Sequence, residues 1–142
     1  VGLGDRDEEL VLKMIDRPNF GLGTFSDVEQ YHLPLQPVAK CQVRRASDFL
    51  SENKILRVDA IKVDVQGFEP EVLLGLSDLL QKSKPVIWLE VGSGTLAQIE
   101  KLSDLARYIP YNFCIRRLES KGMGPRISGG LIPHGDYVLL PE

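Results

Sequence analysis

The sequence predicts an α/β fold, in which strands and helices alternate along the chain. The β-rich segment 60–65 leads into an apolar helical pattern, and a second apolar strand, 86–91, follows it. A strand, a helix and a strand in that order predict two neighbouring parallel strands. With 142 residues, 43% apolar and 26% charged, the composition is that of one soluble domain, residues 1–142, with a single core.

The first 58 residues are less regular than the rest. ELVLKMI (9–15) alternates like a strand, AKCQVR (39–44) is a second strand, and ASDFLSENK (46–54) predicts a short helix capped by Ser47. The segment 19–38 between the two strands is predicted to be a loop, and it contains an isolated His32.

The middle of the chain predicts two helices. Pro70 suits a first helical position, and the helix is expected to run to a stop at Pro85. Its apolar face is formed by Val72, Leu73, Leu76, Leu79 and Leu80. A second helix is expected over 95–109, begun by a capping box of Thr95 and Gln98.

The end of the chain predicts a pair of strands, 113–118 and 136–141, joined by a glycine-rich loop. Trp88, in the middle of the strand 86–91, is expected to pack in the core.

Composition argues against several classes of partner. A net charge of −3, with scattered Lys and Arg, provides no positive stripe for nucleic acid. No apolar run approaches the roughly 18 residues that a membrane span needs. Cys41 and Cys114 are far apart and have no ligand-spaced neighbours, so free thiols in a cytoplasmic protein are expected and a zinc site is not.

The strand 60–65 carries two charges, Lys62 and Asp64, on one face. Ligands of open parallel sheets bind beyond the carboxyl ends of the strands, where Asp64 lies. The next strand brings Glu90 to the same edge, and Glu69 follows the turn. The sequence therefore predicts that Asp64, Glu69 and Glu90 converge, as suits binding a hydroxyl or amine, acting as a general base, or holding a divalent cation.

Structural roles for the same residues stay open. Lys62, which we interpret as structural, would pair with Asp64, Glu69 would complement the positive end of a helix, and Glu90 would accept backbone hydrogen bonds.

The segment VDAIKVDVQGFEPEVLLGLSDLLQKSKPVIWLEV (58–91) resembles the signature of FkbM-type S-adenosylmethionine-dependent methyltransferases. That family has an IKIDVEGxE strand and turn, a VLxG helix and a P-x-x-x-x-E strand. The upstream GLGDRDEELVL and RRASDFL are similar to the family in their order. Gln66 is a departure, since the family commonly has Glu there.

The resemblance implies a partial class I methyltransferase (Rossmann-like) sheet, mostly parallel with an antiparallel C-terminal strand. It implies methyl transfer from S-adenosylmethionine to a hydroxyl of a sugar or natural-product small molecule. The family's glycine-rich cofactor loop does not occur in this sequence. We therefore expect the C-terminal portion of a longer methyltransferase domain, inactive as a fragment.

The resemblance also suggests residue roles. Asp64, Glu69 and Glu90 would lie near the acceptor or the transferring methyl, and Asp5 would border the cofactor's adenine. Turn chemistry favours the alternative that Asp5 is a solvated turn residue. His134 could reach the same edge from its loop, but an isolated loop histidine is typically exposed. The strand 60–65 would leave an unpaired edge, so self-association of the fragment is expected.

Two other classes of function stay open. One is a non-catalytic α/β interaction domain. The other is a magnesium-dependent hydrolase using Asp64 and Glu90.

Overall fold

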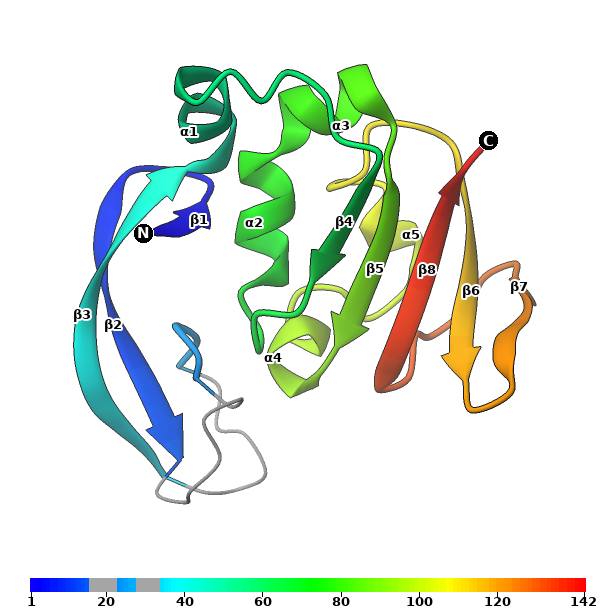
Figure 1. The fold of residues 1–142 in the computed structure, drawn as a ribbon. Helices are drawn as coiled ribbons and strands as arrows, with labels where there is room; N and C mark the ends of the chain where they lie inside the picture. Colours follow the sequence, from blue (N-terminus) through cyan, green and yellow to red (C-terminus); the bar gives the residue numbers. More distant parts are fainter. Residues whose placement is uncertain (16–22, 28–33) are drawn as a thin grey trace.

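The computed structural model describes residues 1–15, 23–27 and 34–142, which form two β-sheets with helices between and beside them (Figure 1). His32 lies outside the described residues. The strands are β1 (Gly2–Gly4), β2 (Glu8–Ile15), β3 (Leu35–Arg45), β4 (Ala60–Val63), β5 (Val86–Val91), β6 (Phe113–Glu119), β7 (Gly122–Ile127) and β8 (Gly135–Pro141). The helices are α1 (Ala46–Glu52), α2 (Glu69–Gly75), α3 (Ser77–Ser83), α4 (Ser93–Leu96) and α5 (Leu102–Leu105).

The first sheet has the order β1-β3-β2, with β2 antiparallel and β1 parallel to β3. The strands predicted at 9–15 and 39–44 are confirmed, and β3 is longer than the sequence pattern indicated. Its extra residues pair with the end of β2, as far as Leu35 opposite Ile15. Strand pairing therefore extends β3 into a segment that was expected to be loop.

The second sheet has the order β4-β5-β8-β6-β7. Its strands β4 and β5 are parallel, as predicted, and β8 lies antiparallel between β5 and β6. Within the described residues the other pairs of this sheet are antiparallel, so the sheet is mixed and the expectation of a mostly parallel sheet is not confirmed. The difference arises partly because β7 forms inside the predicted glycine-rich loop and pairs with β6.

Helices α2 and α3 replace the single predicted helix. Its apolar face is confirmed, since Leu73, Leu76, Leu79 and Leu80 are all buried. The helix is interrupted at Leu76, next to Gly75, where β1 crosses closely. A Cβ atom on Gly75 would lie 1.8 Å from the carbonyl oxygen of Gly4, so only glycine fits this crossing.

Helices α4 and α5 are two short turns, so the predicted continuous helix over 95–109 is wrong. The predicted cap at Thr95 is also wrong, because α4 begins at Ser93 and Thr95 lies inside it. Between the two helices, Lys101 forms an isolated antiparallel bridge with Leu131, which draws this stretch of chain toward the loop before β8.

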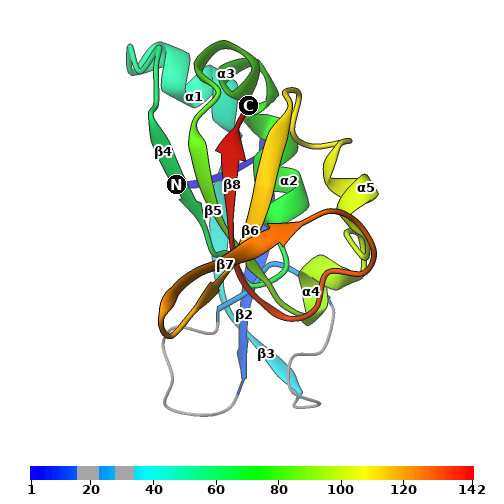
Figure 2. The ribbon, with the colours of Figure 1, turned by 90° about the vertical axis from the view of Figure 1, so that its right-hand side faces the viewer.

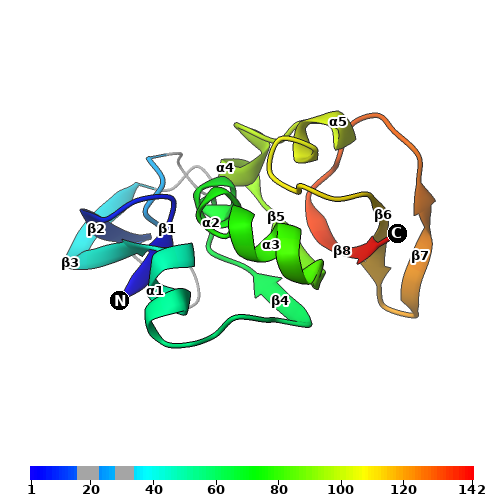
Figure 3. The same cartoon turned by 90° about the horizontal axis from the view of Figure 1, so that it is seen from above.

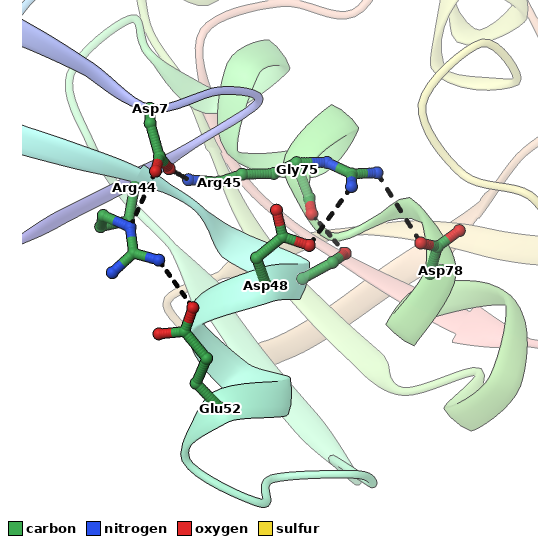
Figure 4. Close-up of polar contacts among 8 residues, drawn as sticks. Asp7, Arg44, Arg45, Asp48, Glu52, Gly75 and Asp78 are labelled. Atoms are coloured by element: carbon green, nitrogen blue, oxygen red, sulfur yellow. Dashed lines mark hydrogen bonds and ion pairs between the residues drawn. The ribbon is translucent and has the colours of Figure 1, made fainter.

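Helix α1 confirms the predicted helix at 46–54, but Ser47 does not cap it. The Ser47 hydroxyl instead donates to the carbonyl oxygen of Gly75, 2.6 Å away at the end of α2. Figure 4 shows the charged network around this junction: the Arg44 guanidinium donates to Asp7 and Glu52, and the Arg45 guanidinium contacts Asp48 and Asp78. The network joins the three-stranded sheet to α1, α2 and α3.

Helices α2 to α5 lie on one face of the five-stranded sheet (Figures 2 and 3). The core between them includes Leu89, Ile115, Tyr137 and Leu139. Trp88 points to the other face and is 42% exposed, so the prediction that it packs in the core is wrong. It is on the same face as Lys62, whose ammonium group lies 5.3 Å from the centre of the indole ring. No helix in the described part of the chain is long and apolar enough to span a bilayer.

Candidate active site

The candidate site lies where the parallel strands β4 and β5 end. Asp64 follows β4 directly, and Glu90 is the fifth residue of β5. The Lys62 ammonium donates to Asp64 Oδ2 at 2.6 Å, which confirms the expected ion pair. The other carboxylate oxygen of Asp64 faces Gln66, which also contacts Glu90. The structure therefore brings Asp64 and Glu90 together, as predicted from the strand order.

Gln66 bridges the two carboxylates. Its amide nitrogen is 2.6 Å from Glu90 Oε2 and 3.2 Å from Asp64 Oδ1. An amide nitrogen carries two N–H donors, one for each carboxylate. The backbone of Gln66 is left-handed, with φ of +54°, a conformation that costs a residue with a Cβ atom roughly 1–2 kcal/mol.

Glu69 holds the turn that follows β4. It is only 1% exposed, and its carboxylate accepts the backbone N–H groups of Val65 and Gly67 and the hydroxyl of Thr95. These hydrogen bonds tie Glu69, the first residue of α2, to the turn after β4 and to helix α4. Both of its carboxylate oxygens accept hydrogen bonds from the protein, so the geometry favours a positioning role for Glu69.

Two glycines make the crossing of the turn and α4 possible. A Cβ atom on Gly94 would lie 2.6 Å from the Cα of Gly67, closer than such atoms approach in proteins. Thr24, from the connection between β2 and β3, also reaches this point. Its buried hydroxyl donates to the carbonyl oxygen of Gln66 at 2.5 Å. The left-handed turn is thus fixed from both sides.

A small cavity of about 170 Å³ opens beside these residues. Its walls are formed by Gln66 and Glu90, by residues 92–94 at the start of α4, by His134 before β8 and by Gly135 at the start of that strand. His134 is exposed, as an isolated loop histidine typically is, and it borders the cavity. The cavity gives Glu90 access to a small group of a ligand.

The two carboxyl groups differ in acidity. Burial raises the pKa of Glu90 to about 7, and the neighbouring carboxyl groups of Asp64 and Asp136 contribute to the rise. The hydrogen bond from Glu90, followed by the one from Lys62, lowers the pKa of Asp64. Near neutral pH, Asp64 is therefore ionised, while Glu90 exchanges a proton readily. This division is typical of a site that has one fixed anion and one general base.

Comparison with known proteins identifies the family of this chain. Residues 8–116 match the family described as the methyltransferase FkbM domain. The chain belongs to the FkbM methyltransferase family. The match covers β2 to the middle of β6, and so includes Asp64, Glu69 and Glu90.

One curated relative is a much larger protein. The AMB antimetabolite synthetase AmbE of Pseudomonas aeruginosa is 35% identical over 82 residues, which are 55% of this chain. The chain covers only 4% of the length of that synthetase. No solved structure matches the chain.

Asp5, the predicted cofactor residue, lies away from the carboxylates of this FkbM domain. It follows β1 and lies against Gly75, at the C-terminal end of α2, whereas Glu69 begins the same helix. Arg6 approaches one of its carboxylate oxygens at 3.6 Å. The other oxygen is buried and accepts no hydrogen bond within the described residues.

Sequence reasoning missed three parts of the site. Thr24 falls in the segment predicted to be a loop, Gln66 is only a departure from the FkbM pattern, and Gly94 has no predicted role. Their roles depend on contacts between segments far apart in the sequence, such as the one joining Thr24 to Gln66. Gly67 and Glu69, two residues apart, are the available signal, because they indicate a tight turn that needs an acceptor.

Proposed function

We propose that the chain is the acceptor-side part of an S-adenosylmethionine-dependent O-methyltransferase. The observation that carries the proposal is Glu90, a carboxyl group with a pKa near 7 in the wall of a cavity. A general base works best when its pKa is close to the operating pH. Membership in the FkbM family supports methyl transfer as the reaction.

In this proposal Glu90 accepts the proton of the acceptor hydroxyl as the oxygen is methylated. Asp64 remains ionised beside it, held by Lys62, and disfavours a second permanent negative charge on Glu90. Glu69 positions the turn. His134 in the cavity wall contacts the acceptor.

The residues present fit only part of the cofactor. S-adenosylmethionine, when bound, supplies an electrophilic methyl group on a positive sulfonium, and carboxylates such as Asp64 and Glu90 suit that charge. The cavity of about 170 Å³ is smaller than the roughly 300–1,000 Å³ of sites that enclose ligands of this size. We therefore propose that residues upstream of Val1 complete the cofactor site, with Asp5 on the cofactor side.

The acceptor is proposed to be a hydroxyl of a sugar or another natural product, and the protein to act in the cytoplasm. The similarity to an antimetabolite synthetase supports the natural-product class.

Calorimetric titration of S-adenosylhomocysteine tests the proposal. The titration is made into this chain and into a polypeptide extended upstream in its native reading frame. Binding by the extended polypeptide alone, or by both, supports a methyltransferase. Binding by neither contradicts the proposal and favours the non-catalytic interaction domain.

A base variant then tests the role of Glu90 in the binding-competent polypeptide. With an acceptor found by screening sugars and polyols for S-adenosylhomocysteine release, Glu90→Gln is expected to lower the rate about 10²- to 10⁴-fold. The matched control, Glu119→Gln at the exposed end of β6, is expected to keep the wild-type rate. Equal rates in both variants would exclude Glu90 as the base.

A magnesium hydrolase is less well supported. The Gln66 amide nitrogen lies between Asp64 and Glu90, where a bridging cation would have to bind, and Mg²⁺ takes oxygen ligands. A thermal shift on adding magnesium that Asp64→Asn removes would reverse this preference.

Self-association is the remaining part of the proposal. The described residues leave the outer edge of β4 unpaired, beside an apolar groove of about 440 Å³ lined by Ile61, Val72 and Leu76 among others. An antiparallel pairing of two copies centred on Val63 would place Lys62 of each opposite Asp64 of the other. Light scattering should show a mass that rises with concentration. A constant monomer mass would contradict this pairing.

A further inference from the structure

The turn after β4 contains an unusual combination of contacts. Gln66 has a positive φ, and its side-chain amide donates hydrogen bonds to both Asp64 and Glu90. A left-handed residue with a Cβ atom persists only where its surroundings hold it. Here the Thr24 hydroxyl fixes its carbonyl oxygen, and Glu69 fixes the N–H groups on either side of it.

The geometry explains why an amide is needed at this position. Asp64 and Glu90 approach one another from neighbouring strands, and two carboxylates at short range repel. A proton on Glu90 relieves this repulsion, and so does a donor that faces both groups. Gln66 supplies two N–H groups without adding charge. The neighbouring carboxylates also determine the orientation of the amide, since its oxygen would be repelled in the same place.

We propose that Gln66 is a positioning residue whose side-chain amide bridges Asp64 and Glu90 and holds the Glu90 carboxyl group at the wall of the cavity. The left-handed backbone of the turn orients this amide toward the two carboxyl groups. The inference rests on the proposed base role of Glu90 for its functional meaning, but the bridge itself does not depend on that role.

The bridge by Gln66 should influence how tightly Glu90 holds its proton. The charged groups that face Glu90 are Asp64 beside it, Asp136 opposite it on β8, Glu69 below the turn and Lys62 on β4. His134 shares the cavity wall. Among these groups, Gln66 is the neutral donor that stabilises the ionised form of Glu90. Loss of its amide should therefore make Glu90 hold its proton to higher pH.

The test is a carbon-13 NMR titration of the glutamate carboxyl groups between pH 4 and 9. Glu90→Gln identifies the Glu90 resonance by its disappearance. Gln66→Gly removes the amide while its backbone accepts positive φ, so the turn is kept and the protein is expected to fold. We expect the titration midpoint of Glu90 to rise by about one pH unit in Gln66→Gly, on the scale of lost hydrogen bonds to a carboxylate.

A second variant separates the bridge from the turn. Thr24→Val removes the hydroxyl that holds the Gln66 carbonyl oxygen but leaves the amide in place, and should move the Glu90 midpoint far less. In an Asp64→Asn background, the effect of Gln66→Gly should shrink, because the amide no longer separates two carboxylates.

An unchanged midpoint in folded Gln66→Gly would overturn the proposal, and so would equal shifts in Gln66→Gly and Thr24→Val. Because the readout is titration and not turnover, the bridge can fail while methyl transfer holds. Equally, the bridge can hold in a protein that binds no S-adenosylhomocysteine.

Discussion

Charged side chains gather at two places, and the two clusters differ in their balance of charge. At the junction of the three-stranded sheet with α1, the guanidinium groups of Arg44 and Arg45 contact carboxylates at the surface, and Asp7 is 60% exposed (Figure 4). At the end of β4, carboxyl groups crowd together, and Glu69 is 1% exposed.

The two clusters also differ in the free energy that their charges cost. Solvent-exposed ion pairs contribute little to the free energy of unfolding, because water solvates the separated charges almost as well. Like charges held close together at a partly buried site lower the stability of the fold. They are tolerated where hydrogen-bond donors surround them.

Removal of the Glu69 carboxylate should be the most damaging change. Glu69→Ala leaves the N–H groups of Val65 and Gly67 and the Thr95 hydroxyl without their acceptor, and is expected to lower the free energy of unfolding by about 3 kcal/mol. Glu71→Ala, in the same turn of α2, is the control and should cost less than about 1 kcal/mol. Urea unfolding measures both. Similar losses would mean that Glu69 acts only on the helix dipole.

The contact of the turn with α4 should be nearly as sensitive. Gly94→Ala places a methyl group 2.6 Å from the Cα of Gly67, and is expected to lower the free energy of unfolding by about 1–3 kcal/mol. Gly92→Ala is the matched control, two residues earlier, where a Cβ atom meets nothing within 4 Å. Thermal unfolding compares them, and equal midpoints would show that the crossing can relax.

Stability should depend on pH through Glu90. Its folded pKa of about 7 is above the ordinary value of 4.5, so the folded state binds more protons between these values. The contribution of Glu90 to stability is thus fully present below about pH 4.5 and is lost as the pH rises through 7. Urea unfolding at several pH values should show this decline in the wild type and a flatter curve in Glu90→Gln. Parallel curves would contradict the raised pKa.

The Arg44 network should show the smallest effect. Arg44→Gln removes its ion pairs with Asp7 and Glu52, and we expect a slight loss of stability that 1 M salt abolishes. The isolated Arg57–Asp59 pair is the control, and Arg57→Gln should change nothing measurable. A loss as large as that of Glu69→Ala, retained in salt, would remove the distinction between the two clusters.

Several elements can be predicted from local patterns of residues alone. The apolar stripe of α2 and α3, the alternation of β2 and the β-rich run of β4 are properties of neighbouring residues, and the parallel order of β4 and β5 follows from chain connectivity. The meeting of Asp64 and Glu90 could be predicted for the same reason.

Other features depend on contacts between segments that are far apart in the sequence. The break at Leu76 comes from β1 crossing Gly75, and the exposure of Trp88 comes from which face of the sheet the helices cover. The role of Gln66 and the acidity of Glu90 depend on Thr24, α4 and β8. Desolvation and close packing are set by groups far away in the chain, and no local pattern of residues encodes them.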